Sequence, residues 1–75
     1  MTERQYLIVI EGNDDAGFSV YVPDLPGCVA TATTREDVER EMQDAIAFHL
    51  EGLQEAGEQI PEPSGLTATY IKVAA

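Results

Sequence analysis

The stretch FSVYVPDLPGCVATATTREDV, residues 18–38, decides the fold because it holds two strands, a rigid turn and the start of a helix. Its first part alternates, with apolar residues at 18, 20 and 22 and with Ser19 and Tyr21 between them. This is the period of a half-buried strand, Phe18 to Val22. Pro23 ends that strand, and the turn after it is stiff because proline fixes φ. An extended pattern resumes over Cys28 to Thr33, so we expect an antiparallel pair.

An earlier strand is expected over Tyr6 to Ile10, which is apolar, rich in β-branched residues and followed by turn-forming residues. It completes an antiparallel three-strand meander. This strand is apolar on both faces, yet a single helix covers only one face of a sheet. We therefore expect a second copy of the chain to cover the other face, as a dimer or tetramer. The expected interface residues are Tyr6, Ile8, Tyr21 and Tyr70.

A long helix is predicted over Arg35 to Ala56. Thr34 is a suitable N-cap, and Glu36 and Asp37 lie where the positive end of the helix dipole favours acids. Gly57 supplies the stop. At 100° per residue the apolar residues fall on one face, which packs on the sheet; they are Val38, Met42, Ala45, Ile46, His49, Leu53 and Ala56.

A fourth strand is predicted over Thr67 to Val73, where the sequence alternates again. Pro61 and Pro63 exclude a continuing helix before it. The order is then β-β-β-α-β, and a right-handed crossover places the last strand parallel to the first. The expected fold is α+β, two-layered, with residues 1–75 forming a single domain.

Charge excludes several classes of partner. The chain has 75 residues, with 14 acidic residues against 4 Lys and Arg, and a net charge of −10. Direct binding to nucleic acid or to an anionic membrane is not expected, because both need clustered basic residues. No apolar run approaches the roughly 18 residues of a membrane span, and no signal-peptide pattern opens the chain. The single cysteine excludes an internal disulfide and fits a reducing compartment, so we expect a cytoplasmic protein.

No residue pattern predicts catalysis or a cofactor. His49, the only histidine, falls within the apolar stripe of the helix, and we interpret it as a buried structural residue. Cys28 follows a tight turn, where a small apolar side chain packs well. Asp14 and Asp15 lack the spacing of a calcium loop. We therefore expect no enzyme activity, no metal and no cofactor.

The exposed helix face is strongly acidic. Residues 34–56 contain seven acids and two arginines, a net charge of −5. We expect some pairing of Arg40 with Glu36 and Asp44. The excess of negative charge suits a basic partner, and Phe48 flanks this face as a possible apolar anchor.

The chain resembles the HicB-like antitoxin family over about Tyr6 to Val73. The resemblance is carried by YVPDLPGCVA at residues 21–30, TATT at 31–34 before the acids of the helix start, and GEQIPEP at 57–63. It implies a partial RNase H-like fold and a domain without catalytic activity. It also implies that the chain binds a small basic HicA-type toxin, an RNA-cleaving protein, and blocks the active site of that toxin.

The leading interpretation is an antitoxin-like binding module. Family members generally carry a separate C-terminal DNA-binding domain, which we do not expect here. A stand-alone homo-oligomer without a toxin is the alternative, and a metal-dependent nuclease comes last because its acids cannot be matched to this sequence. The expected partner-binding residues are Asp24, Leu25, Pro26, Asp44, Phe48, Glu51 and Glu55.

Overall fold

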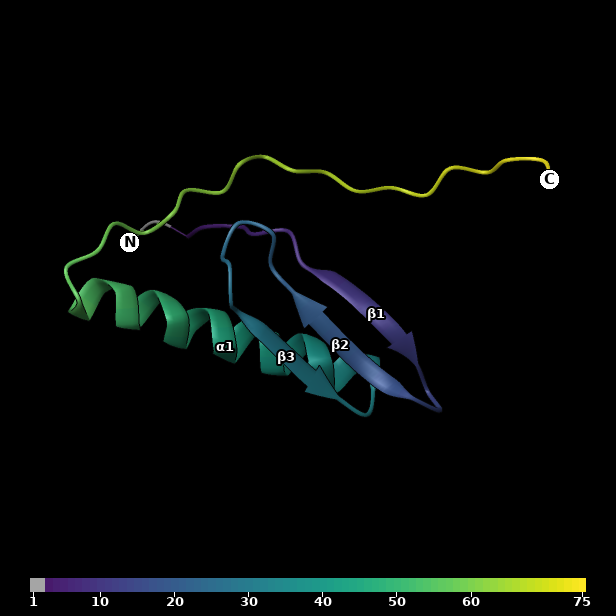
Figure 1. Ribbon diagram of the computed structural model, residues 1–75, viewed down its shortest axis with the longest axis horizontal. Helices are drawn as coiled ribbons and strands as arrows, with labels where there is room; N and C mark the ends of the chain where they lie inside the picture. The colour runs from purple at the N-terminus through teal and green to yellow at the C-terminus, as the bar shows by residue number, and fades with distance from the viewer. Residues whose placement is uncertain (1–2) are drawn as a thin grey trace.

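The computed structural model describes residues 3–75, which form a three-stranded sheet covered by one helix (Figure 1). The sheet is antiparallel, in the order β1-β2-β3, and α1 contacts β2 and β3 on one face. This confirms the predicted meander, the long helix and the α+β class. The elements are β1 (Val9–Asn13), β2 (Gly17–Tyr21), β3 (Val29–Ala32) and α1 (Arg35–Glu55).

Strand β1 lies later in the chain than its apolar run. It begins at Val9 rather than Tyr6 and continues to Asn13, which pairs with Gly17. The Asn13 side chain accepts hydrogen bonds from the backbone N–H groups of Asp15 and Ala16, at 3.0 and 2.8 Å, and so closes the turn. At Gly12 the φ angle is +130°, and a Cβ there would lie 2.1 Å from the Gly17 carbonyl oxygen. Glycine and asparagine, which usually indicate a loop, are therefore part of this ladder.

The helix has the predicted start and ends one residue early. The Thr34 hydroxyl accepts a hydrogen bond from the Asp37 backbone N–H at 3.0 Å, which is the N-cap geometry. At the other end, the Glu58 N–H donates to the Leu53 carbonyl at 2.9 Å, and Gly57 has a φ of +73°. A positive φ favours glycine, so Gly57 ends the helix as predicted.

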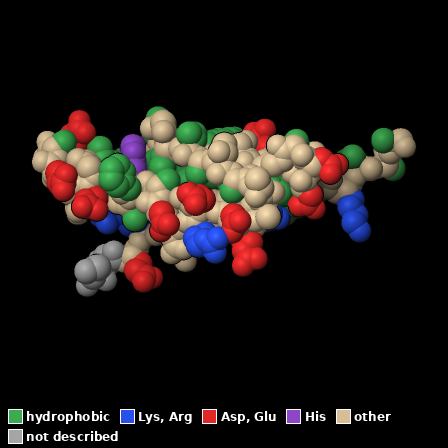
Figure 2. Space-filling view, turned by 90° about the horizontal axis from the view of Figure 1, so that it is seen from below, with side chains coloured by type: hydrophobic (Ala, Val, Ile, Leu, Met, Phe, Trp, Pro, Cys, Tyr) green, Lys and Arg blue, Asp and Glu red, His purple; other side chains and the backbone are tan. Residues whose placement is uncertain are grey.

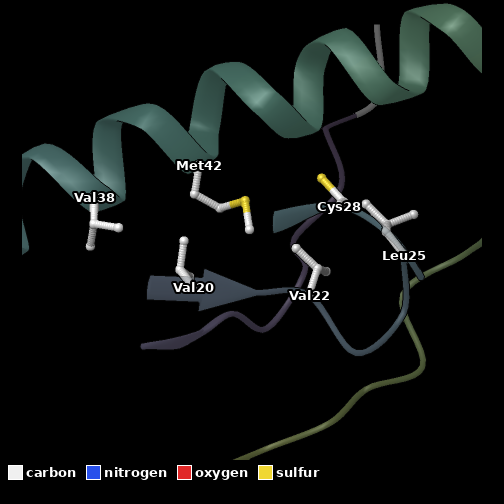
Figure 3. Close-up of a cluster of buried hydrophobic side chains, with 6 residues drawn as sticks. All are labelled: Val20, Val22, Leu25, Cys28, Val38 and Met42. Atoms are coloured by element: carbon white, nitrogen blue, oxygen red, sulfur yellow. The ribbon is translucent and has the colours of Figure 1, made fainter. Parts of the chain in front are cut away.

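The core lies between the sheet, the turn after β2 and the first half of α1. Figure 3 shows side chains from these three places pointing toward one another. Val38 and Met42 of α1 are 0% exposed, and both pack into this cluster. Cys28 is also part of it, as the packing interpretation expected. The full set is Val20, Val22, Leu25, Cys28, Val38 and Met42.

The predicted fourth strand is not formed in the part of the chain that the structure describes. Residues 66–75 are exposed and carry no strand ladder, so the parallel pairing with β1 and the RNase H-like fold are not seen. Residues 61–64, which precede this segment, are held by hydrogen bonds to distant parts of the chain. Tyr6 donates its hydroxyl hydrogen to the Pro61 carbonyl, and Ser64 donates from its N–H and hydroxyl to the Asp24 carboxylate at 3.0 and 2.8 Å. These contacts direct the following segment past β1 instead of against it (Figure 1).

The contact between Asp24 and Ser64 is expected to depend on pH. The Ser64 backbone N–H, and then its hydroxyl, hold the pKa of Asp24 below its ordinary value of 3.8. A lowered carboxyl pKa means that the contact is complete above the ordinary value and is lost as the pH falls through the lowered one. In an NMR titration the Ser64 amide should therefore shift with a midpoint below that of an unstructured aspartate, and Asp24→Asn should abolish the shift. A midpoint at or above 3.8 would contradict this assignment.

Candidate partner-binding site

Among residues 3–75, the acids in the second half of α1 have no ion-pair partner. The two ion pairs of this helix lie in its first half, where Arg35 reaches Glu39 at 3.7 Å and Arg40 pairs with Asp37. The predicted pairs of Arg40 with Glu36 and Asp44 are therefore wrong, because the Arg40 guanidinium pairs with Asp37, three residues earlier. From residue 41 to the helix end there is no Lys or Arg.

These acids form a narrow band, which we call the acidic stripe: Glu41, Asp44, Glu51 and Glu55. At 3.6 residues per turn, their positions and that of Phe48 fall within an arc of about 80°. All five residues are exposed. The stripe therefore presents four carboxylates and one aromatic ring on the same side of the helix.

The stripe runs into the negative end of the helix dipole. The last turn of α1 contains no basic residue, and Glu51 and Glu55 lie within its final two turns. Acids at this end are unfavourable for the helix because the free carbonyl groups there already carry partial negative charge. A positively charged partner would relieve this repulsion, so the arrangement favours a basic surface.

Replacing Glu55 with Gln should stabilise the protein. The change removes one charge from the negative end of the dipole, and the expected gain is about 0.3–1 kcal/mol in the free energy of unfolding. Urea denaturation monitored by circular dichroism measures it. The matched control is Glu36→Gln in the first turn, where the acid is favourable, and this variant should lose stability by a similar amount. A loss of stability in Glu55→Gln would contradict the argument.

A hollow of about 680 Å³ lies beside the stripe, between α1 and the start of β3. We call it the Phe48 groove. Its apolar lining comes from Cys28, Val29, Ala45, Phe48 and Leu53, and Glu41, Asp44 and Glu58 border it. The Phe48 side chain is 80% exposed. An apolar hollow rimmed by acids suits a partner that offers both a basic and an apolar group.

His49 also lines this groove, which corrects its interpretation as a buried residue. It is half-buried and does not belong to the core cluster. Figure 2 shows the single histidine, in purple, next to hydrophobic side chains, with acidic side chains spread over the same face. The helical periodicity predicts that His49 faces the sheet, but the sheet does not extend far enough along α1 to cover it.

The turn after β2 contributes less than predicted to an accessible surface. Leu25 is 1% exposed and belongs to the core, so a partner cannot reach it. The Asp24 carboxylate is occupied by Ser64. Pro26 remains exposed. The turn is therefore mainly a structural element, and its hydrogen bonds agree: the Leu25 N–H donates to the Val22 carbonyl at 3.1 Å.

The predicted interface residues lie on different surfaces. Tyr6 and Ile8 pack against the core on the helix side of the sheet, because they alternate in phase with Ile10. Tyr21 is 43% exposed on the opposite, open face. The strand register places it between Val9 and Val29, which forms an apolar row across all three strands. Tyr70 is fully exposed in the C-terminal segment. Val29 was missed, although the alternation of β3 places it on the open face.

The chemistry available at these surfaces is that of contact. Within residues 3–75, no three side chains of the metal-binding types gather closely enough to hold an ion. Burial raises the pKa of the Cys28 thiol, which lowers its fraction of reactive thiolate. In the same part of the chain, no helix has both the length and the apolar character to cross a bilayer.

Comparison with known proteins gives one family and several relatives. A sequence model of the HicB-like antitoxins of bacterial toxin-antitoxin systems matches residues 6–73. An uncharacterized 14.9 kDa protein from the rep-hol intergenic region of Haemophilus phage HP1 is 40% identical over 57 residues, which is 76% of this chain and 42% of the phage protein. A UPF0150 protein of Thermoplasma acidophilum is 32% identical over 57 residues, 83% of its length. Another, from Archaeoglobus fulgidus, is 36% identical over 47 residues, 68% of its length.

Proposed function

Since the chain belongs to the HicB-like antitoxins of bacterial toxin-antitoxin systems, we propose that it neutralises a small, basic, RNA-cleaving toxin of the HicA type. It does so by covering the active site of that toxin. The observation that carries this proposal is the acidic stripe, because its four carboxylates lack counter-ions within the described residues and adjoin an exposed aromatic ring.

The mechanism we propose is competition for a basic surface. An enzyme that cleaves RNA must bind phosphate groups, so its active-site face is rich in Lys and Arg. The carboxylates of the stripe occupy the positions that phosphates would take, and opposite charges also speed the encounter of the two proteins. Phe48 then inserts as an apolar anchor, the kind of residue that contributes most to interface affinity.

The contact residues we propose are Asp44, Phe48, Glu51 and Glu55 from the predicted set, together with Glu41 and the exposed Pro26. Asp24 and Leu25 are left out because one is held by Ser64 and the other is buried. The chain acts by binding rather than by catalysis, needs no cofactor, and works in the cytoplasm, where the RNA substrates of such a toxin are found.

A homo-oligomer without a toxin is the second candidate function. The apolar row of Val9, Tyr21 and Val29 on the open sheet face favours it, because the side chains of Tyr21 and Val29 are 43% and 65% exposed. Two such faces packed together would bury both rows. Oligomerisation through the row would by itself be compatible with toxin binding, since the row and the acidic stripe lie on different surfaces.

A pull-down from the native cells separates the two candidates. The tagged chain is used as bait at low and at high salt, and mass spectrometry identifies what is retained. We expect one small basic ribonuclease-like protein, with less of it at high salt because salt screens exposed charges. Recovery of the bait alone, as an oligomer, would remove the antitoxin proposal and leave the second candidate.

A further inference from the structure

The C-terminal segment, residues 66–73, is an extended segment that pairs with no strand of the described chain. It is extended, and its large apolar side chains are open to solvent, with Tyr70, Ile71 and Val73 100%, 76% and 79% exposed. Figure 1 shows it running past β1 and ending beyond the sheet. Among the hydrogen bonds of the described chain, none involves this segment. Exposed apolar segments of this kind are sites of association.

Because of this segment, the radius of gyration and the accessible surface of the chain are larger than those of a compact monomer. Its radius of gyration is 14.3 Å, whereas a compact domain of this length has about 11 Å. The accessible surface is 6096 Å², about a third more than the roughly 4,500 Å² expected at this mass. The excess, on the order of 1,600 Å² for one chain, is about twice the roughly 800 Å² that each partner buries in a standard protein interface.

A receiving surface exists along β1. This strand is hydrogen-bonded to β2 on one side only, so its outer edge is unpaired in the part of the chain described. A hollow of about 560 Å³ follows that edge, lined by Ile8, Val9 and Ile10. A second hollow, of about 780 Å³, continues it toward residues 4–8, with Met42 and Ile46 of α1 among its lining. An unpaired edge beside apolar lining is what an added strand requires.

The chain's own segment stands away from this edge. Residues 61–64 are fixed by Tyr6 and Asp24, so the segment passes β1 on the far side of the hollows and forms their outer wall through residues 66–70. Gly65 comes directly after the fixed residues. Its φ is +76°, and a Cβ there would meet nothing within 4 Å, so the chain can pivot at this position.

We propose that two copies exchange these segments, so that residues 66–73 of each copy pair with the β1 edge of the other as a fourth strand. The exchange fills the hollows and covers the β1 edge of each copy. It also buries the exposed apolar residues of both segments. It leaves the contacts of residues 61–64 in place, because the pivot lies after them. The exchange is independent of the proposed function, since it uses neither the acidic stripe nor the Phe48 groove.

Paramagnetic labelling of mixed copies tests the exchange directly. A spin label is placed at Ala74→Cys in a Cys28→Ala background, and the labelled copies are refolded with unlabelled copies carrying nitrogen-15. We expect the amide signals of residues 9–13 in the nitrogen-15 copies to weaken roughly twofold or more, relative to a diamagnetic label, because the label directly follows the exchanged strand. Broadening only when label and nitrogen-15 share one chain would instead show closure onto the chain's own β1, and no broadening would show a free segment. Either result overturns the proposal.

Proline substitutions test whether backbone pairing is responsible. Thr69→Pro and Tyr70→Pro each remove one N–H, and because neighbouring N–H groups point to opposite sides, one of the two must lie on the paired edge. We expect one variant to lose the broadening between copies and most of the dimer mass in light scattering. The controls Thr69→Ala and Tyr70→Phe keep the N–H and should keep both. If both proline variants kept the broadening and the dimer mass, the exchange would be contradicted.

Discussion

Reversing two charges of the acidic stripe, Asp44→Lys with Glu51→Lys, is expected to weaken binding of a basic partner by about 100-fold, or ~2.7 kcal/mol. The two positions are seven residues apart, so they lie on the same side of α1. In the proposed complex each carboxylate faces a basic group, and each lysine would place like charges opposite one another. Isothermal titration calorimetry or surface plasmon resonance with the captured partner measures the change.

The control for this variant must carry the same net charge. Asp14→Lys with Asp15→Lys adds the same four units at the turn between β1 and β2, where both residues are exposed. If the stripe is the contact surface, the control should bind within a few-fold of the unchanged protein, the residual effect coming from long-range attraction. Equal losses in both variants would mean that only the overall charge matters and would contradict a localised site.

Replacing Met42 with Ala is expected to cost about 2–5 kcal/mol of the free energy of unfolding. The Met42 side chain is 0% exposed and belongs to the core cluster between α1 and the sheet. A domain of this length has a total stability of only about 4–11 kcal/mol. The variant should therefore unfold at a much lower urea concentration and be partly unfolded at 37 °C.

The neighbouring residue provides the control for the core prediction. Gln43 is exposed on the same helix turn, and Gln43→Ala should change the free energy of unfolding by less than about 0.5 kcal/mol. Urea denaturation of both variants measures the difference. If Met42→Ala were no more costly than Gln43→Ala, the helix would not be packed on the sheet as described.

The helix and the turn could be predicted because their signals are local. Thr34 caps the helix through a residue three positions away, and Gly57 ends it through its own backbone. The turn after β2 is set by prolines that fix their own φ. Such features depend on neighbours in the sequence, so reading the sequence recovers them.

The predictions that the structure corrects have a common feature. Each depends on contacts between residues that are distant in the sequence. Leu25 looks like an exposed turn residue, but the turn folds back and inserts it into the core. The alternation over residues 67–73 predicts a strand, but these residues form no strand ladder in the part of the chain described, and alternation does not say which edge would receive them. The contacts of Asp24 with Ser64 and of Tyr6 with Pro61 join residues 40 and 55 positions apart, and no local pattern shows them.

The acidic stripe was predicted only in part. Composition and helical spacing identified an acidic face with Phe48 on it, because both follow from the sequence alone. The position of the Phe48 groove depends on how α1 lies against β3, and the place of His49 on its wall depends on where the sheet ends. Those are properties of packing. The sequence therefore indicated the charge of the site but not its shape.

The most direct test of the central claim is RNA cleavage by a HicA-type toxin from the same organism, measured while the chain is titrated in. We predict that cleavage falls to the background level near a one-to-one ratio of the two proteins. The variant with Asp44→Lys and Glu51→Lys should need about 100-fold more protein once the concentrations are near the dissociation constant. Cleavage that stays unchanged at a large excess of the unaltered chain would contradict the antitoxin function.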